Sequence, residues 1–442
     1  MIPHATQSPL PLEGSGEAST ICALATAPGG ALGIIRVSGP DAFSAVSTIC
    51  SVCCNAIAAN TVHFTRIKDG TEVIDEALVT IFRAPHSYTG EDAVEISCHG
   101  SRYILNKVLE LLVRQGCRMA EPGEYTKRAY LNGKMDLSQA EAVADLIASA
   151  NRATHHLAMS QLRGGISTEL AKLREQLLKM TSLLELELDF SDHEDLEFAD
   201  RTELLQLAQQ IDTHITRLAE SFLTGQALKE GFPVAIVGAP NVGKSTLLNS
   251  LLNEERAIVS DIQGTTRDTI EDTIQIAGIN FRFIDTAGIR HTADKIEQMG
   301  IERSINAAQR ARIIIMMAEP GVPFPNLEVR KDQTVIRIEN KTKLFQAKYG
   351  IGLDALKQQL IAATPKMGNA DIIVSNARHY DALLRAQQSL ARVIAGLHDG
   401  LSGDLLSEDL RDAINILAEI TGGQITPQET LNNIFSHFCV GK

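Results

Sequence analysis

Short apolar runs separated by polar residues mark the first part of the chain as a mixed α+β segment, from Thr20 to about Asn132. They predict strands over Gly33–Val37, Ala77–Phe82 and Val94–Cys98. Between Tyr103 and Arg114 the apolar residues take helical spacing, and a glycine follows the helix.

From Ser138 to about Glu230 the apolar residues recur at steps of three and four, which predicts helices. The clearest stripe is Ile166, Leu170, Leu173, Leu177, Met180 and Leu184. This spacing is typical of a coiled coil, and we interpret it as the core of a helical bundle. Helical spacing returns after Pro365. The helical segments before and after therefore pack together, with the segment from Gly231 inserted between them.

The division expected is an N-terminal α+β domain (residues 1–135), two parts of a discontinuous helical domain (136–229 and 367–442) and an inserted α/β domain (230–366). In the inserted α/β domain, buried strands are expected at Val234–Val237, Phe281–Ile284, Ile313–Met317 and Val335–Ile338.

The sequence Gly-Ala-Pro-Asn-Val-Gly-Lys-Ser, Gly238 to Ser245, lies between the first of these strands and a helical pattern. This order is typical of a phosphate-binding loop rather than a chance glycine turn. Its backbone N–H groups surround phosphate oxygens, Lys244 reaches the outer phosphates and the Ser245 hydroxyl holds Mg²⁺. The expected nucleotide contacts in the loop are Asn241, Val242, Gly243, Lys244, Ser245 and Thr246.

Two later segments fit the switches of a GTPase. The first contributes Ser260, Asp261, Ile262, Gln263, Gly264, Thr265 and Thr266, and the second contributes Asp285, Thr286, Ala287 and Gly288. Thr266 is the expected second Mg²⁺ ligand and catalytic residue, with an ordinary turn residue as the alternative. Three phosphate-binding elements in this order predict a GTPase.

Ile289 stands where Ras-type enzymes have the glutamine that positions water. Another polar group must take over this task. Asn241, Arg290 and Glu297 are the candidates nearby, although the latter two also fit a solvated helix face.

Recognition of the guanine base is less complete. Asn340 and Lys341 match the base-binding motif Asn-Lys-x-Asp, but Lys343 stands where the aspartate is expected. Gln346-Ala347-Lys348 resembles the second base-contacting loop, and the residues between the two motifs hardly suffice for a strand. Upstream, Pro320, Pro323 and Pro325 oppose a crossover helix. One hypothesis is that residues are missing from the printed sequence around 319–345, which an intact mass would test.

Composition limits the class of protein. The 442 residues are 44% hydrophobic and suffice for two or three domains, with no apolar run long enough to span a membrane. Residues 1–20 do not resemble a secretory signal. A net charge of −13 argues against broad electrostatic binding of nucleic acid, leaving a local basic patch or a partner open. The seven cysteines show no zinc spacing, and we expect a reducing, cytoplasmic location.

The chain resembles the bacterial tRNA-modification GTPases of the MnmE (TrmE) family, in the TrmE-Era-EngA-like superfamily of Ras-type GTPases. Beside the loop and switches, the resemblance rests on these motifs: Gly33-Ile34-Ile35-Arg36, Tyr88-Thr89-Gly90-Glu91-Asp92, Glu121-Pro122-Gly123-Glu124-Tyr125-Thr126-Lys127-Arg128-Ala129 and the terminal Phe438-Cys439-Val440-Gly441-Lys442.

The resemblance implies a folate-binding N-terminal domain, a homodimer, and a heterotetramer with the FAD protein MnmG (GidA). The pair would modify C5 of the tRNA wobble uridine, with a one-carbon unit from 5-formyltetrahydrofolate or another tetrahydrofolate derivative and GTP as substrate. Glycine or ammonium would supply the amine.

The resemblance also assigns residues. Arg36, Glu95, Lys134 and Lys442 would bind folate, and Cys439 is a candidate reactive thiol. K⁺ would be bound by Asn241, the backbone of Ser260 and Ile262, and Thr265. With Lys244 and Thr266, Asn241 would be catalytic, and Glu297 would orient water.

A different class of function stays open at this stage. A nucleotide-controlled assembly factor would carry similar loops without taking part in chemistry. It would leave the terminal Phe-Cys-Val-Gly-Lys motif and the folate-type N-terminal block unexplained.

Overall fold

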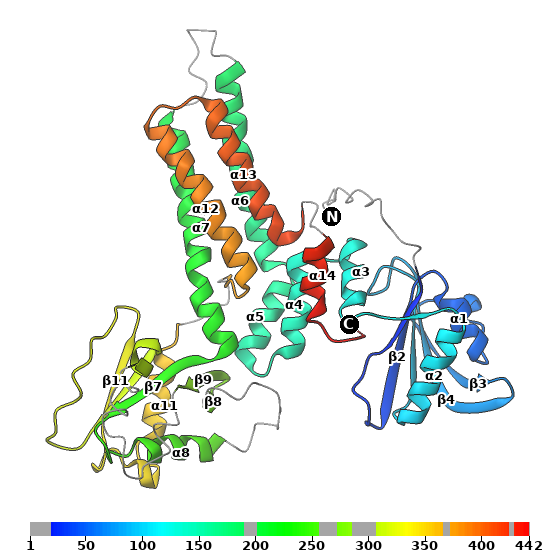
Figure 1. Cartoon of the computed structure of the whole chain (residues 1–442), viewed down its shortest axis with the longest axis horizontal. Helices are drawn as coiled ribbons and strands as arrows, with labels where there is room; N and C mark the ends of the chain where they lie inside the picture. Colours follow the sequence, from blue (N-terminus) through cyan, green and yellow to red (C-terminus); the bar gives the residue numbers. More distant parts are fainter. Residues whose placement is uncertain are drawn as a thin grey trace. The chain divides into compact units, whose positions relative to one another are not determined.

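The computed structural model describes residues 19–189, 201–255, 272–284, 306–365, 372–423 and 428–441. They form two compact units (Figure 1). The first comprises the described residues of Met1–Ile147, Gln161–Ala171 and Leu417–Lys442, and the second those of Ala148–Ser160 and Lys172–Ile416.

The first unit contains a six-stranded sheet in the order β3-β4-β5-β2-β1-β6. The strands are β1 (Ile21–Leu24), β2 (Leu32–Ser38), β3 (Thr61–Asp69), β4 (Glu72–Phe82), β5 (Ala93–His99) and β6 (Arg118–Met119). All pairs are antiparallel except β1 with β6. Helices α1 (Ala42–Ile49) and α2 (Arg102–Arg114) pack their buried apolar sides into the same core as the sheet. The predicted strands and helix are therefore confirmed.

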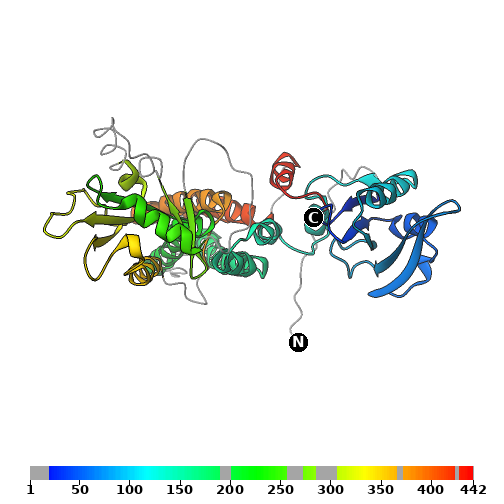
Figure 2. The same ribbon diagram turned by 90° about the horizontal axis from the view of Figure 1, so that it is seen from below.

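The C-terminal segment packs on the N-terminal one within this unit. The helices here are α3 (Glu124–Leu131), α4 (Leu137–Ala148) and α14 (Gln428–Ser436). Leu137 of α4 and Phe435 of α14 share a buried cluster with Phe438. The chain after α14 runs toward the N-terminal sheet in both views (Figures 1 and 2). There the Gly123 N–H donates to the Cys439 carbonyl at 3.3 Å.

Long helices dominate one part of the second unit. They are α6 (Gly165–Asp189), α7 (Arg201–Glu230), α12 (Ala377–His398) and α13 (Gly403–Thr421), and α5 (Arg152–Leu162) precedes them, although the first residues of α6 and the last residues of α13 belong to the first unit. Gln387 of α12 donates to Thr216 of α7 at 2.6 Å, and Arg411 of α13 pairs with Glu185 of α6 at 2.8 Å. The predicted stripe of α6 is buried from Ile166 to Leu184. Helices from before and after the inserted segment thus lie side by side, as the apolar spacing predicts.

The inserted segment forms a five-stranded sheet in the order β11-β10-β7-β9-β8. The strands are β7 (Phe232–Gly238), β8 (Asp272–Ile276), β9 (Ile279–Phe283), β10 (Ile313–Ala318) and β11 (Thr334–Glu339). Only β8 and β9 pair in antiparallel fashion. Helices α8 (Lys244–Glu255) and α11 (Leu353–Ala362) pack against one face. The predicted α/β character of the inserted domain and its four buried strands are therefore confirmed, and the predicted phosphate loop lies at the end of β7.

Two connections in this domain lack the residues for a helix or a strand, as the sequence predicts. Residues 319–333 join the parallel strands β10 and β11 without a helix, and Phe324 and Leu327 from this segment pack on the sheet instead. Parallel strands are ordinarily joined by a helical crossover. Residues 342–345 form a turn and no strand. Within this turn the Thr342 N–H donates to the Phe345 carbonyl at 3.1 Å.

The turn between β8 and β9 contacts the start of α5. The Ala153 N–H donates to the Gly278 carbonyl at 3.3 Å, and Gln275 Nε2 donates to the Ala150 carbonyl at 3.5 Å. Ala153 is buried in the core of the five-stranded sheet. The hairpin is therefore attached to the helical part of the same unit. None of the helices in the described ranges combines the length and apolar character needed to cross a bilayer.

Candidate nucleotide and folate sites

The loop between β7 and α8 has the backbone of a phosphate-binding loop. Asn241 and Gly243 both take left-handed conformations, with φ of 61° and 104°. A Cβ atom at Gly243 would lie 2.4 Å from Asn340 Nδ2, so this position requires glycine. Such a loop presents backbone N–H groups to an anion at the start of a helix.

Lys244, which is predicted to reach the outer phosphates, begins α8. Its Nζ donates to the carbonyls of Gly238 at 2.7 Å and Ala239 at 2.9 Å. Burial lowers the pKa of Lys244 below its ordinary value. A phosphate beside the ammonium group would favour its charged form. Ser245 and Thr246 follow in the first turn of α8.

Asn340 joins the predicted phosphate loop to the segment predicted to be the second base-contacting loop. The side chain is 4% exposed. Its Nδ2 donates to the Val242 carbonyl at 2.8 Å, and its Oδ1 accepts from the Ala347 N–H at 3.1 Å. The short 3₁₀ turn η2 (Ala347–Tyr349) is thereby held against the phosphate loop. The structure therefore brings Asn340 to the predicted phosphate loop, while the Nζ of the following Lys341 pairs with Glu319.

The remaining predicted nucleotide contacts lie outside the described residues. These are Ser260, Asp261, Ile262, Gln263, Gly264, Thr265, Thr266, Asp285, Thr286, Ala287 and Gly288, together with Ile289, Arg290 and Glu297. Strand β8 follows the first group in the chain and β9 precedes the second. The hairpin that contacts α5 thus connects the two predicted switches.

A second group of predicted residues meets at the centre of the N-terminal sheet. Arg36 on β2 and Glu95 on β5 are direct register partners. Arg36 donates from Nε and Nη2 to Glu95 Oε1, at 2.9 and 2.7 Å. Arg36 Nη1 donates to the Gly441 carbonyl at 3.1 Å, so the C-terminal tail reaches this pair. Lys442 itself lies outside the described residues.

Aromatic rings enclose the Arg36 guanidinium. Its carbon lies 5.9 Å from the ring centroid of Tyr88 and 5.7 Å from that of Tyr125, distances at which the ring face attracts a cation. The Tyr125 hydroxyl donates to the Arg36 carbonyl at 2.7 Å. Burial raises the pKa of Tyr88 above its ordinary value, so the phenol stays protonated. Predicted Lys134 lies at the neighbouring loop, where its Nζ donates to the Pro85 carbonyl at 2.8 Å.

The comparisons with known proteins identify the family of the chain. Residues 20–134 match the GTP-binding protein TrmE N-terminus, and residues 137–439 match the MnmE helical domain. The tRNA modification GTPase MnmE of Bacteroides fragilis is 52% identical over 463 positions, which cover 96% of this chain and 99% of the relative. The chain belongs to the MnmE family of tRNA modification GTPases. The MnmE proteins of Bacteroides thetaiotaomicron and Porphyromonas gingivalis are 51% and 50% identical, over 96% of this chain and 99% and 98% of their own lengths.

Each of these alignments has more positions than the 442 residues of this chain, so the MnmE relatives carry residues without a counterpart here. This agrees with the short connections at 319–333 and 342–345. The hypothesis that residues are missing from the printed sequence stays a prediction.

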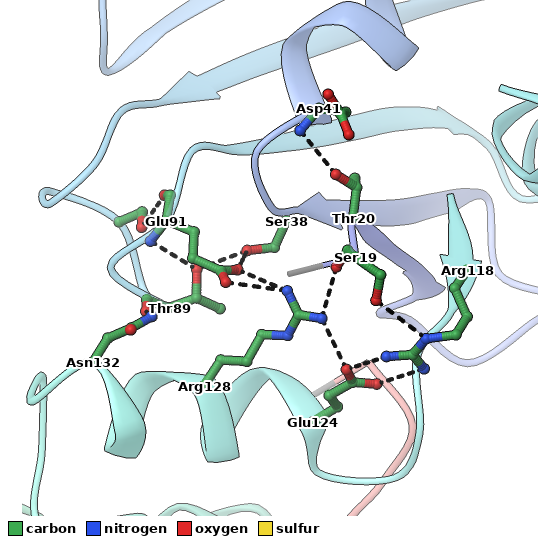
Figure 3. A network of polar contacts seen from close by, with 11 residues as sticks. Ser19, Thr20, Ser38, Asp41, Thr89, Glu91, Arg118, Glu124, Arg128 and Asn132 are labelled. Carbon is green, nitrogen blue, oxygen red and sulfur yellow. Dashed lines mark hydrogen bonds and ion pairs between the residues drawn. The ribbon is translucent and has the colours of Figure 1, made fainter. Parts of the chain in front are cut away.

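A polar network explains two of the MnmE-like motifs (Figure 3). Arg128 donates to Glu91 at 3.1 and 3.2 Å, to Glu124 Oε1 at 3.0 Å and to the Ser19 carbonyl at 2.8 Å. Glu124 is also held by Arg118. The network ties the loop of residues 88–92 to α3, and these two segments supply Tyr88 and Tyr125 to the Arg36 site.

Sequence reasoning did not predict the tyrosines or the Gly441 carbonyl as parts of this site. The motifs around residues 88 and 125 were visible, but only the folded sheet shows that both meet Arg36. Cys439 is exposed and close in sequence to Gly441. Among the described residues, no group of three His, Cys, Asp or Glu side chains is placed to hold a metal ion.

Proposed function

We propose that this MnmE-family chain is a K⁺-activated GTP hydrolase that acts with the FAD protein MnmG (GidA) on tRNA. Together they would install an aminomethyl-type group at C5 of the wobble uridine, with a one-carbon unit from a tetrahydrofolate derivative. The observation that carries the proposal is the bond from Arg36 to the tail carbonyl of Gly441. A nucleotide switch alone gives no reason to bring the C-terminal motif to the N-terminal sheet.

The chemistry of the Arg36 site fits a folate. The Arg36–Glu95 pair is mostly buried, with side chains 20% and 27% exposed, so a carboxylate acceptor is held in place for the N–H donors of a pterin ring. Tyr88 and Tyr125 offer aromatic surface beside it. Lys134 and the terminal Lys442 would supply positive charge for the carboxylates of the folate tail.

In the nucleotide domain Ser245 and Thr266 would hold Mg²⁺, and Asn241 would hold K⁺ with the backbone of Ser260 and Ile262 and with Thr265. Asn241 takes a left-handed conformation three residues before Lys244 in the loop. K⁺ would supply the positive charge that an arginine finger supplies in other GTPases. Glu297 would orient water, since Ile289 lacks a polar group.

The β8–β9 hairpin supports communication between hydrolysis and the helical domain. It connects the two switch segments and bonds to the start of α5 at Ala153. A change in the switches therefore has a direct route into the helices. The functional assembly would be a homodimer that binds MnmG as a heterotetramer, with domains at 1–135, 136–229, 230–366 and 367–442.

Calorimetry with 5-formyltetrahydrofolate tests the folate site on the full chain. Wild type is expected to bind, and Arg36→Ala to bind at least tenfold more weakly because Glu95 loses its partner and the tail its anchor. Arg66→Ala is the matched control, since Arg66 pairs with Glu76 on the exposed side of the sheet. Absence of binding by wild type, or equal binding by Arg36→Ala, would contradict the proposal.

A further inference from the structure

Helix α5 carries three basic side chains on one side. Arg152, His155 and His156 are all exposed. Residues three and four apart are neighbours on the surface of a helix, so both histidines lie one turn along from Arg152. Ala153 and Leu157, on the other side of the helix, are buried. We call Arg152, His155 and His156 the basic face of α5, a helix labelled in Figure 1.

The basic face has no carboxylate to neutralise it. Within the described ranges, none of its three side chains makes an ion pair. The chain has no acidic residue between Asp145 and Glu169, so α5 itself supplies none. By contrast, Arg392 of α12 pairs with Asp409 of α13 at 2.7 Å. On a chain with a net charge of −13, an uncompensated basic face favours an anionic partner.

The start of α5 is anchored to the nucleotide domain. The Ala153 N–H donates to the Gly278 carbonyl, in the turn of the β8–β9 hairpin, at 3.3 Å. A Cβ atom at Gly278 would lie 3.1 Å from the Cβ of Arg152, so the turn packs directly beside the first residue of the basic face. The basic face is therefore held next to the hairpin that connects the two predicted switches.

The side chains of the basic face suit the phosphates of a nucleic acid. A guanidinium donates two parallel hydrogen bonds to one phosphate. An imidazole donates from one ring nitrogen when neutral and from both when protonated. Contacts of this kind hold the backbone of a nucleic acid and fix its position without reading its sequence. The chain belongs to a family of tRNA modification GTPases, so tRNA is the anionic partner that these side chains fit.

We propose that the basic face of α5 binds the phosphate backbone of tRNA. A local patch of this kind lets a chain with a net negative charge hold RNA, and it places the RNA beside the β8–β9 hairpin. The inference rests on the action of the family on tRNA and is independent of the folate chemistry proposed above.

The test measures binding of an unmodified tRNA transcript to the full chain by fluorescence anisotropy over a series of KCl concentrations. Arg152→Glu is expected to weaken binding about tenfold or more, because a bond to a charged phosphate is lost and a repulsive charge replaces it. The slope of log K against log [KCl] should fall in magnitude by about 1. The double variant His155→Ala, His156→Ala is expected to weaken binding about threefold or more.

Both α5 variants should keep the helix folded. Glutamate in the first turn of a helix interacts favourably with the helix dipole, and alanine has the highest helix propensity. Equal thermal unfolding midpoints of the variants and wild type would check this. A loss of binding can then be assigned to the basic face and not to unfolding.

Arg217→Glu is the matched control. Arg217 is also exposed, on α7, and has no ion pair in the part of the chain that the structure describes, but Glu220 lies one turn along from it. Its tRNA affinity and salt slope should equal those of wild type. Equal weakening by Arg217→Glu and Arg152→Glu would overturn the inference, as would unchanged tRNA binding in both α5 variants.

Two further results would also overturn it. One is the absence of tRNA binding by wild type. The other is weaker binding of the FAD protein MnmG by Arg152→Glu with unchanged tRNA binding, which would make the basic face a surface for a protein partner. Normal binding of 5-formyltetrahydrofolate by the same variants would show that the proposed folate site stands even if this inference fails.

Discussion

Replacing Arg128 with alanine tests whether the polar network holds the Arg36 site together. Arg128 makes ion pairs with Glu91 and Glu124 and donates a hydrogen bond to the Ser19 carbonyl. The side chains of Arg128, Glu91 and Glu124 are 13%, 20% and 11% exposed. In the variant Glu124 keeps Arg118, whereas Glu91 keeps only neutral partners such as Ser38. Removing hydrogen bonds to charged groups and partly buried ion pairs of this kind is expected to lower the free energy of unfolding by about 2–4 kcal/mol.

Hydrogen exchange on the full chain measures this loss where it occurs. Amides of residues 84–92 and 118–132 should exchange roughly 30- to 700-fold faster, since 1.4 kcal/mol corresponds to a factor of ten. Peptides from α12 in the second unit serve as the internal reference. Arg114→Ala is the matched variant and should cost less than about 1 kcal/mol, because its partners Asp69 and Glu110 are more exposed.

The effect also has a defined dependence on pH. Burial alone would raise the pKa of Glu124, but bonds from Arg118, the Glu121 N–H and Arg128 outweigh it and hold the pKa below its ordinary value. A carboxyl group with a lowered folded-state pKa stabilises the protein above its unfolded pKa of roughly 4.3, and this contribution is lost as the pH falls through the folded value. The difference between wild type and Arg128→Ala should therefore be full at neutral pH and shrink in acid. Unchanged exchange in these segments at neutral pH would refute the role given to the network.

Three further predictions follow from the sites. GTP turnover should rise severalfold when K⁺ replaces Na⁺, and Asn241→Ala should abolish that rise; equal wild-type rates in both salts would contradict K⁺ activation. Gly441→Val should weaken folate binding at least tenfold, because the φ of Gly441 is 89° and a Cβ there would lie 2.5 Å from the Leu24 carbonyl. Calorimetry measures this affinity, and an affinity equal to that of wild type would contradict the prediction. A thiol reagent should modify Cys53 and Cys439 first, as both are exposed; rapid labelling of other cysteines in the folded protein, seen by mass spectrometry, would count against the fold.

The sequence predicted the parts of the structure that depend on local pattern. The strands at Gly33–Val37 and Val234–Val237 and the loop that follows the latter are set by apolar runs and glycine spacing. The sequence also showed too few suitable residues for a crossover helix around Pro323 and for a strand at Thr342, because each of these elements needs a minimum length. Their outcome, with Phe324 packing on the sheet in place of a helix, depends on tertiary contacts.

The Arg36 site could be predicted only in part. Arg36, Glu95 and Lys134 came from family resemblance, and nothing in their spacing places Arg36 opposite Glu95. That arrangement follows from the register of β2 and β5, which lie far apart in the sequence. The contributions of Tyr125 and the Gly441 carbonyl come from segments that meet only after α14 packs near α3. Contacts of such long range leave no periodic signal in a single sequence.

The central claim is that this chain takes part in modifying the tRNA wobble uridine. The most direct test is the nucleoside content of tRNA from cells that lack the chain, measured by mass spectrometry and compared with cells that carry wild type or Arg36→Ala. The account predicts that the C5-modified wobble uridine disappears in the deletion, returns with wild type and does not return with a stably expressed Arg36→Ala. Normal levels of the modified nucleoside in the deletion strain would contradict it.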